Sequence, residues 1–212
     1  MQSISSHIDD LLIHCYWLDY NSKNLLDAHS NLQLLAVACL LKKTNIKKVV
    51  ILGGKIDLHR KSLGKIIYQE LSKKIDRKLA SKIIVVPNSL TTRQEVRGFR
   101  KLVEKNHWHN IASLCLSVQL PRVKRAYKRI FSDKHNQIGF VKTEDMLNQL
   151  GYEKEVAEYT NSKELKLLKL NEILVGTING IPIIGGYLID IMIKIFPWKG
   201  VFLSKIFSVG NK

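Results

Sequence analysis

Cysteine, proline and acidic residues are all scarce in this sequence of 212 residues. The three cysteines (Cys15, Cys39 and Cys115) form no C-x-x-C motif and cannot all pair with one another, which argues against a disulfide framework or a zinc ribbon. With 4 prolines, 12 glycines and 45% hydrophobic residues, the chain belongs to neither a linker-rich nor a collagen-like class. Its length suits one α/β domain with an appendage and suffices for a sizeable core.

Familiar catalytic and nucleotide-binding motifs are missing too. The sequence has no G-x-G-x-x-G, no phosphate-binding G-x-x-x-x-G-K-[ST], no G-x-S-x-G and no H-E-x-x-H. His107 and His109 are the only close histidine pair, and no metal-ligand pattern is complete around them, so no metal site is predicted. Residues 1–8 lack the basic segment of a secretory signal, and Asp9-Asp10 stand where its apolar segment would begin. We therefore expect a cytoplasmic protein.

The net charge is the most unusual feature of the composition. There are 34 Lys+Arg residues and 18 Asp+Glu residues, a formal net charge of +16. Residues 42–82 and 93–129 are the most basic segments. Such a surplus favours polyanionic partners or an anionic membrane surface, and it is equally a feature of a merely solubilising surface.

Short apolar runs alternate with helical patterns over the first 140 residues. Residues 49–52 and 83–86 are apolar at every position, which is typical of strands covered on both faces. The sequence therefore predicts an α/β fold, a Rossmann-like, doubly wound, mostly parallel sheet with helices on both faces. The expected strands are 11–15, 49–52, 83–86, 111–116 and 138–141, and the expected helices begin at Ser30, Ser62, Thr92 and Pro121.

A different composition marks residues 151–212, which we assign to a helical and hydrophobic C-terminal extension of an α/β domain at 1–150. A polar helix is expected over 159–172. Residues 173–189 carry no charge, but four glycines and one proline make them a poor membrane-spanning helix. Three placements of this hydrophobic tail stay open: packing on the domain, a subunit interface, or contact of residues 173–205 with an anionic membrane surface.

Candidate binding residues follow the expected strands, because ligands of open parallel sheets bind at the carboxyl ends of the strands. Gly53 and Gly54 allow close approach of a ligand to the backbone, although a plain turn explains them equally well. Thr92 and Glu95 have the spacing of a capping box, which would place a helix N-terminus at this edge.

A second helix start is expected after the strand that ends near Leu116. Pro121 suits the first helical position, which puts Arg122 in the first turn, at the positive end of the helix dipole. The arrangement is favourable if an anion such as a phosphate or carboxylate lies between the helix start and Arg122. A solvated basic helix face, which also contains Lys128, is the equally weighted alternative.

The order of these motifs resembles the YdcF/SanA/ElyC family of bacterial α/β proteins, over about residues 8–150. The resemblance rests on the strand that ends in Gly53-Gly54, on Ser62, and on the segments 89–95 and 117–122. It implies a Rossmann-like fold with a small-ligand pocket at the strand ends and, for several members, a link to cell-envelope maintenance. The ligand-binding residues that it implies are Gly53, Gly54, Ser62, Thr91, Thr92, Ser117, Gln119 and Arg122.

The departures from that family concern proton transfer. Leu63 stands where the family has a glutamate, and Gln119 stands where it has a histidine. These replacements remove the obvious acid and base, so the pocket can persist without catalysis. Whether the protein is an enzyme, and with which cofactor, is left open.

Three functions compete at this point. The first is a protein that binds a small anionic ligand, nucleotide-like or phosphorylated. The second is a nucleic-acid-binding module, suggested by the charge of +16 but disfavoured by the lack of a recognised motif and of aromatics among the basic residues. The third is a basic protein peripheral to the inner face of the cell membrane. The first is our expectation.

Overall fold

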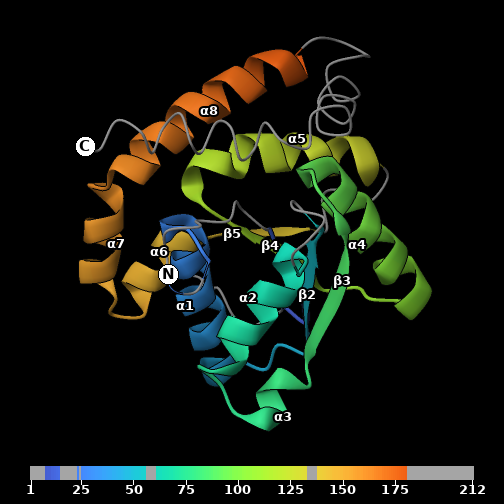
Figure 1. Ribbon diagram of the computed structural model, residues 1–212. Helices are drawn as coiled ribbons and strands as arrows, with labels where there is room; N and C mark the ends of the chain where they lie inside the picture. Colours follow the sequence, from blue (N-terminus) through green and yellow to red (C-terminus); the bar gives the residue numbers. More distant parts are fainter. Residues whose placement is uncertain (1–7, 15–22, 24, 56–60, 133–137, 181–212) are drawn as a thin grey trace.

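Five parallel strands form one sheet at the centre of the molecule in the computed structural model (Figure 1). The structure describes residues 8–14, 23, 25–55, 61–132 and 138–180, without the side chains of 171 and 174–180. The strand order is β3-β2-β1-β4-β5, and every neighbouring pair is parallel. The strands are β1 (Asp10–Ile13), β2 (Lys48–Gly53), β3 (Ile83–Ser89), β4 (Ile111–Cys115) and β5 (Gly139–Lys142).

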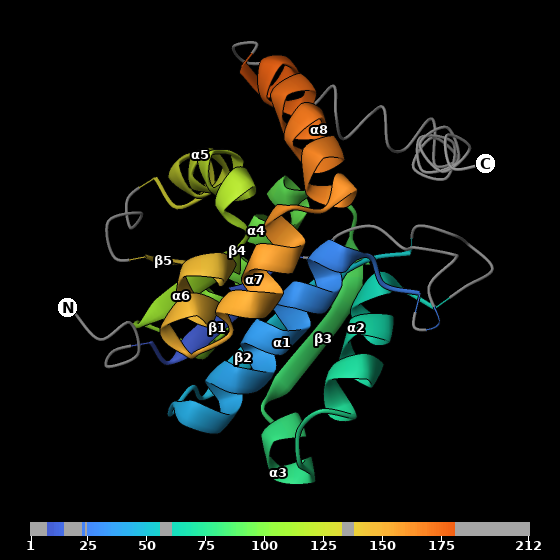
Figure 2. The same cartoon turned by 90° about the vertical axis from the view of Figure 1, so that its left-hand side faces the viewer.

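Helices cover both faces of this sheet, as Figures 1 and 2 show. One face packs against α1, α2, α6 and α7, and the other against α4 and α5. The helices are α1 (Ala28–Lys43), α2 (Leu63–Ser72), α3 (Arg77–Ala80), α4 (Thr92–Asn106), η1, a 3-10 turn (Ser117–Gln119), α5 (Leu120–Ile130), α6 (Thr143–Gln149), α7 (Glu153–Thr160) and α8 (Lys163–Gly180). The expected doubly wound α/β fold is confirmed.

Successive side chains of a strand point to opposite faces of the sheet, so the sheet divides the core into two clusters. Leu11 and Ile13 of β1 join the cluster under α1 and α2, whereas Leu12 between them joins the cluster under α4 and α5. After Asp10, β1 has apolar side chains on both faces because helices cover both faces of the sheet. This explains why the strands read as continuous hydrophobic runs.

Several predicted boundaries were wrong. The first strand, expected at 11–15, is Asp10–Ile13. The first helix begins at Ala28, where the Asp27 side chain accepts a hydrogen bond from the Ser30 backbone N–H at 2.7 Å, so Ser30 lies inside the first turn and is not the cap. Strand β3 continues through Pro87 to Ser89, which an edge strand tolerates because its outer N–H groups need no partner strand. Helix α5 begins one residue early, at Leu120, and Pro121 is in its first turn.

The first part of the C-terminal extension packs on the α/β domain. The expected helix over 159–172 is replaced by α7 and α8, with a break near Asn161. Val156, Tyr159, Leu165 and Leu168 are buried in the same cluster as α1. Most of the hydrophobic tail and of the predicted membrane contact at 173–205 lies outside the described residues. None of the helices that the structure describes is long and apolar enough to cross a membrane.

Candidate functional site

The topology gathers the candidate residues at one edge of the sheet. Chain connections diverge on either side of the adjacent strands β1 and β4, and the carboxyl ends at such a switch point form the ligand crevice of doubly wound folds. The predicted residues lie after β2, after β3 and after β4, all at carboxyl ends. They are Gly53 and Gly54; Thr91 and Thr92; and Ser117, Gln119 and Arg122, with Ser62 capping the helix that follows β2.

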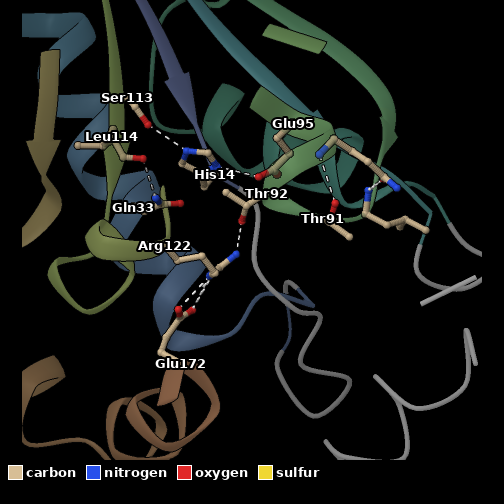
Figure 3. A network of polar contacts seen from close by, with 11 residues as sticks. His14, Gln33, Thr91, Thr92, Glu95, Ser113, Leu114, Arg122 and Glu172 are labelled. Atoms are coloured by element: carbon tan, nitrogen blue, oxygen red, sulfur yellow. Dashed lines mark hydrogen bonds and ion pairs between the residues drawn. The ribbon is translucent and has the colours of Figure 1, made fainter. Parts of the chain in front are cut away.

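Arg122 is the centre of the strongest polar contact at this edge. Its Nε lies 2.9 Å from Oε2 of Glu172, and its Nη2 lies 2.7 Å from Oε1 of the same carboxylate. This is the two-pronged pairing of a guanidinium with a carboxylate. The Arg122 Nη1 group also donates a hydrogen bond to the Thr92 hydroxyl (Figure 3). The side chains of Arg122 and Glu172 are only 20% and 9% exposed.

Three helices distant in sequence create this contact. Thr92 begins α4 and Arg122 lies in the first turn of α5, and the two helices pack against each other. Glu172 comes from α8, which passes over α5 in Figure 1 and contacts η1. Arg122 thus pairs with a carboxylate of the chain itself.

Ser117 holds a second carboxylate at the start of η1. Its backbone N–H and its hydroxyl donate to Glu144, at 2.9 Å each to Oε2. Glu144 lies in the first turn of α6, just after β5. The exposed N-terminus of the 3-10 turn is therefore occupied by an internal anion, in agreement with the preference of helix starts for negative charge.

Helix α4 begins at Thr92 as predicted, but its cap residue differs by one position from the prediction. The N-cap is Thr91, not Thr92, and its hydroxyl accepts from the backbone N–H of Gln94 at 3.2 Å. The Gln94 side chain completes the reciprocal contact by accepting from the Leu90 N–H at 2.8 Å. Thr92 is therefore released from capping, and its hydroxyl is available to contact Arg122.

The glycines and Ser62 serve the packing of β2 against α2 and β3. The Gly54 N–H donates to Ser89 O, and a Cβ on Gly54 would lie 2.9 Å from that oxygen. Ser62 is the N-cap of α2, and its hydroxyl accepts a long hydrogen bond from the Lys65 backbone N–H, at 3.4 Å. Ser62 is 1% exposed. These residues are near the crevice, but their contacts here are structural, and Gln119 is likewise buried.

A buried polar network that the sequence analysis missed lies beside this crevice. His14 Nδ1 lies 2.7 Å from Glu95 Oε2, and His14 Nε2 lies 2.9 Å from the Ser113 hydroxyl (Figure 3). The contact joins the end of β1, helix α4 and strand β4. Spacing in the sequence gives no signal for it, because the three residues are 81 and 99 positions apart.

The order Ser-His-Glu resembles a catalytic triad, but burial excludes that use in this conformation. His14, Ser113 and Glu95 are 1%, 0% and 3% exposed, so no substrate atom reaches the serine hydroxyl. Cys115 in the same strand is no nucleophile either, because burial and, next, the Glu144 carboxylate raise the pKa of its thiol to about 12. These four side chains are thus all buried in the core.

Another buried acid lies at the opposite edge of the sheet. Asp10 begins β1 at the amino end, and burial, with the neighbouring Asp9 carboxylate, raises its pKa to about 6. Among the residues that the structure describes, no group of His, Cys, Asp and Glu is placed to hold a metal ion. At this edge of the sheet, Arg122 contacts the Glu172 carboxylate and the Thr92 hydroxyl.

No protein-family model, no curated protein and no solved structure matches this chain.

Proposed function

We propose that the protein binds a small ligand carrying a phosphate or carboxylate group at the carboxyl edge of its sheet, and that Arg122 and Thr92 hold that group. One observation carries the proposal: the Arg122 guanidinium forms a bidentate pair with the Glu172 carboxylate at this edge of the sheet. The planar fork of arginine matches a phosphate as well as it matches a carboxylate.

The surroundings of Arg122 support binding more than turnover. The Thr92 hydroxyl fixes one guanidinium nitrogen from the side, which reduces the rotamer freedom that an anion would otherwise have to immobilise. His14 and Glu95, beside this crevice, are bonded to each other and buried. A nucleotide-like or phosphorylated compound is thus a ligand here, and we expect little hydrolysis of generic phosphoesters.

Glu172 occupies the position that the ligand's anionic group would take. Binding therefore requires that α8 withdraw this carboxylate from Arg122. The contact is only partly buried, so solvent weakens it, and a ligand with a doubly charged phosphate competes favourably with a single carboxylate.

The test measures the affinity for inorganic phosphate and for a nucleoside monophosphate by isothermal titration calorimetry. Arg122→Gln removes the fork, and Lys128→Gln removes an equal charge from an exposed position two turns further along the same helix. A charge-assisted contact contributes about 1.5–3 kcal/mol, so we expect Arg122→Gln to weaken binding by about tenfold or more. Lys128→Gln should change it by less than about threefold.

Equal losses in the two variants would show that binding depends on overall charge and would refute the assignment to Arg122. A wild-type protein that binds neither probe, together with a Glu172→Gln variant that binds neither, would refute the proposed function itself.

A further inference from the structure

A basic face lies at the amino edge of the sheet, at the opposite ends of the strands from Arg122. Two segments form it: residues 42–48, which join α1 to β2, and residues 73–82, which join α2 to β3 through α3. Both segments lead into strands of the same parallel sheet, so both lie at its amino edge. Figures 1 and 2 both show α3 at the end of the molecule where α1 and α2 finish. We call these two segments the amino face.

Hydrogen bonds hold the two segments of the amino face side by side. The Lys82 ammonium group donates to the Ile46 carbonyl oxygen at 2.8 Å, and the Val49 N–H donates to the Lys82 carbonyl oxygen at 3.1 Å. Strands β2 and β3 are neighbours from this point on, with Val49 opposite Ile83. The charges of the two segments therefore act together.

The amino face is more basic than a surface that only keeps a protein in solution. Nine residues of the two segments are Lys or Arg, and Asp76 is their one acid. A solubilising surface intersperses charges of both signs. Like charges that are gathered in one place repel each other and destabilise the folded chain. Their concentration therefore indicates a partner of opposite charge.

The acids that contact the amino face in the described part of the chain leave its cations in solvent. Lys47 Nζ lies 3.2 Å from Asp9 Oδ2, and Lys73 Nζ lies 2.6 Å from Glu70 Oε1, yet the two lysine side chains are 68% and 69% exposed. Asp76 is the N-cap of α3, where its carboxylate accepts a backbone N–H at 2.7 Å. Ion pairs with such exposed lysines contribute little free energy, so a larger anionic partner can replace them.

The kind of cation indicates which partner fits. Eight of the nine basic residues are lysines, and Arg77 is the one arginine. The planar fork of arginine is the group that proteins favour for close recognition of nucleic-acid phosphates, whereas the lysine ammonium is a strongly hydrated point charge on a flexible stem. Hydrated point charges are attracted by the diffuse negative potential of an anionic bilayer, and lysine-rich clusters of about this size are typical of proteins that bind it.

We infer that the amino face binds the surface of a membrane that contains anionic phospholipid. Each basic residue close to such a surface strengthens binding by about fivefold. Because the amino and carboxyl edges are opposite ends of one sheet, the bound protein directs the crevice with Arg122 away from the bilayer. Neither Arg122 nor Glu172 takes part, so this inference and the proposed function can fail separately.

The experiment measures sedimentation of the full chain with vesicles of phosphatidylcholine that contain about 30% phosphatidylserine, at about 0.1 M salt. The face variant is Lys74→Gln/Lys78→Gln, at two exposed positions on either side of the start of α3. The matched control is Lys55→Gln/Lys65→Gln, which removes the same charge from exposed positions after β2 and in the first turn of α2, at the carboxyl edge. The reversal variant Lys74→Glu/Lys78→Glu doubles the change of charge at the positions of the face variant.

We expect the face variant to bind these vesicles at least about tenfold more weakly than the control, and the reversal variant to bind more weakly still. The wild type should bind vesicles of phosphatidylcholine alone at least about tenfold more weakly than the mixed vesicles.

Equal losses in the face variant and the control would overturn the assignment to the amino face. Three other results would overturn anionic lipid as the partner. They are a wild type that binds neither kind of vesicle, a wild type that binds both kinds equally, and tighter binding to duplex DNA than to the mixed vesicles, lost in the face variant.

Discussion

Removal of the Glu95 carboxylate tests how the buried network supports the edge of the sheet. Glu95 is 3% exposed and its Oε2 lies 2.7 Å from His14 Nδ1. Glu95→Ala leaves His14 Nδ1 buried and without this hydrogen-bond partner, which costs about 1.5–3 kcal/mol in the free energy of unfolding. Glu95→Gln should cost less, about 1 kcal/mol, because the amide oxygen still accepts.

Urea unfolding followed by circular dichroism at neutral pH measures these costs. Glu104→Ala is the matched control, because it removes the same side chain from the same helix at a site where the carboxylate contacts exposed Arg100. That exposed pair contributes less than about 1 kcal/mol, and the gain in helix propensity is common to both variants. If Glu95→Ala loses no more stability than Glu104→Ala, the network does not stabilise the fold in the way described.

Two further predictions concern buried positions outside the network. Burial lowers the pKa of His29 from 6.5 to about 4, so the stability due to its neutral form is complete above pH 6.5 and is lost as the pH falls to about 4. The loss of stability over this pH range amounts to about 3 kcal/mol. Urea unfolding should show this loss in the wild type but not in His29→Gln, and identical pH profiles of the two proteins would contradict the prediction. Gly64→Ala should lower stability by about 1–3 kcal/mol despite its better helix propensity, because the new Cβ would lie 2.9 Å from the Gly53 carbonyl oxygen. Gly98→Ala should lower stability less, because its Cβ would meet the movable Leu52 side chain at 3.1 Å. If thermal unfolding shows Gly98→Ala to be less stable than Gly64→Ala, this account of the packing is wrong.

The fold was predictable because its strands are covered on both faces. Runs such as 49–52 contain only apolar residues, and every residue of that run is buried in the structure. The errors occur at element ends, where local hydrogen bonds decide the boundary. Asp27 and Ser30 are both good N-cap residues, and the sequence does not show which of them the chain uses.

The site was predictable only in part. The position of Arg122 after a strand and in a first helical turn indicated an anion, and a bound carboxylate is present there. That the carboxylate is Glu172 could not be predicted, since a contact over 50 residues depends on where α8 packs. His14 gave no signal for a similar reason: its partners lie on two other elements, and burial of a histidine cannot be inferred from its neighbours in the sequence.

The affinity for inorganic phosphate of the Glu172→Gln variant tests the central claim most directly. Titration calorimetry measures the phosphate affinity of the wild type, of Glu172→Gln and of Glu158→Gln. The first variant loses the carboxylate that pairs with Arg122, and the second loses an exposed carboxylate on α7. The two-pronged Arg122–Glu172 pair, worth at least about 1 kcal/mol, competes with the ligand. Glu172→Gln should therefore bind phosphate at least about fivefold more tightly than the wild type, while Glu158→Gln should bind within about twofold of it. An affinity of Glu172→Gln equal to or weaker than that of the wild type would contradict the account of Arg122 as an anion site that Glu172 occupies.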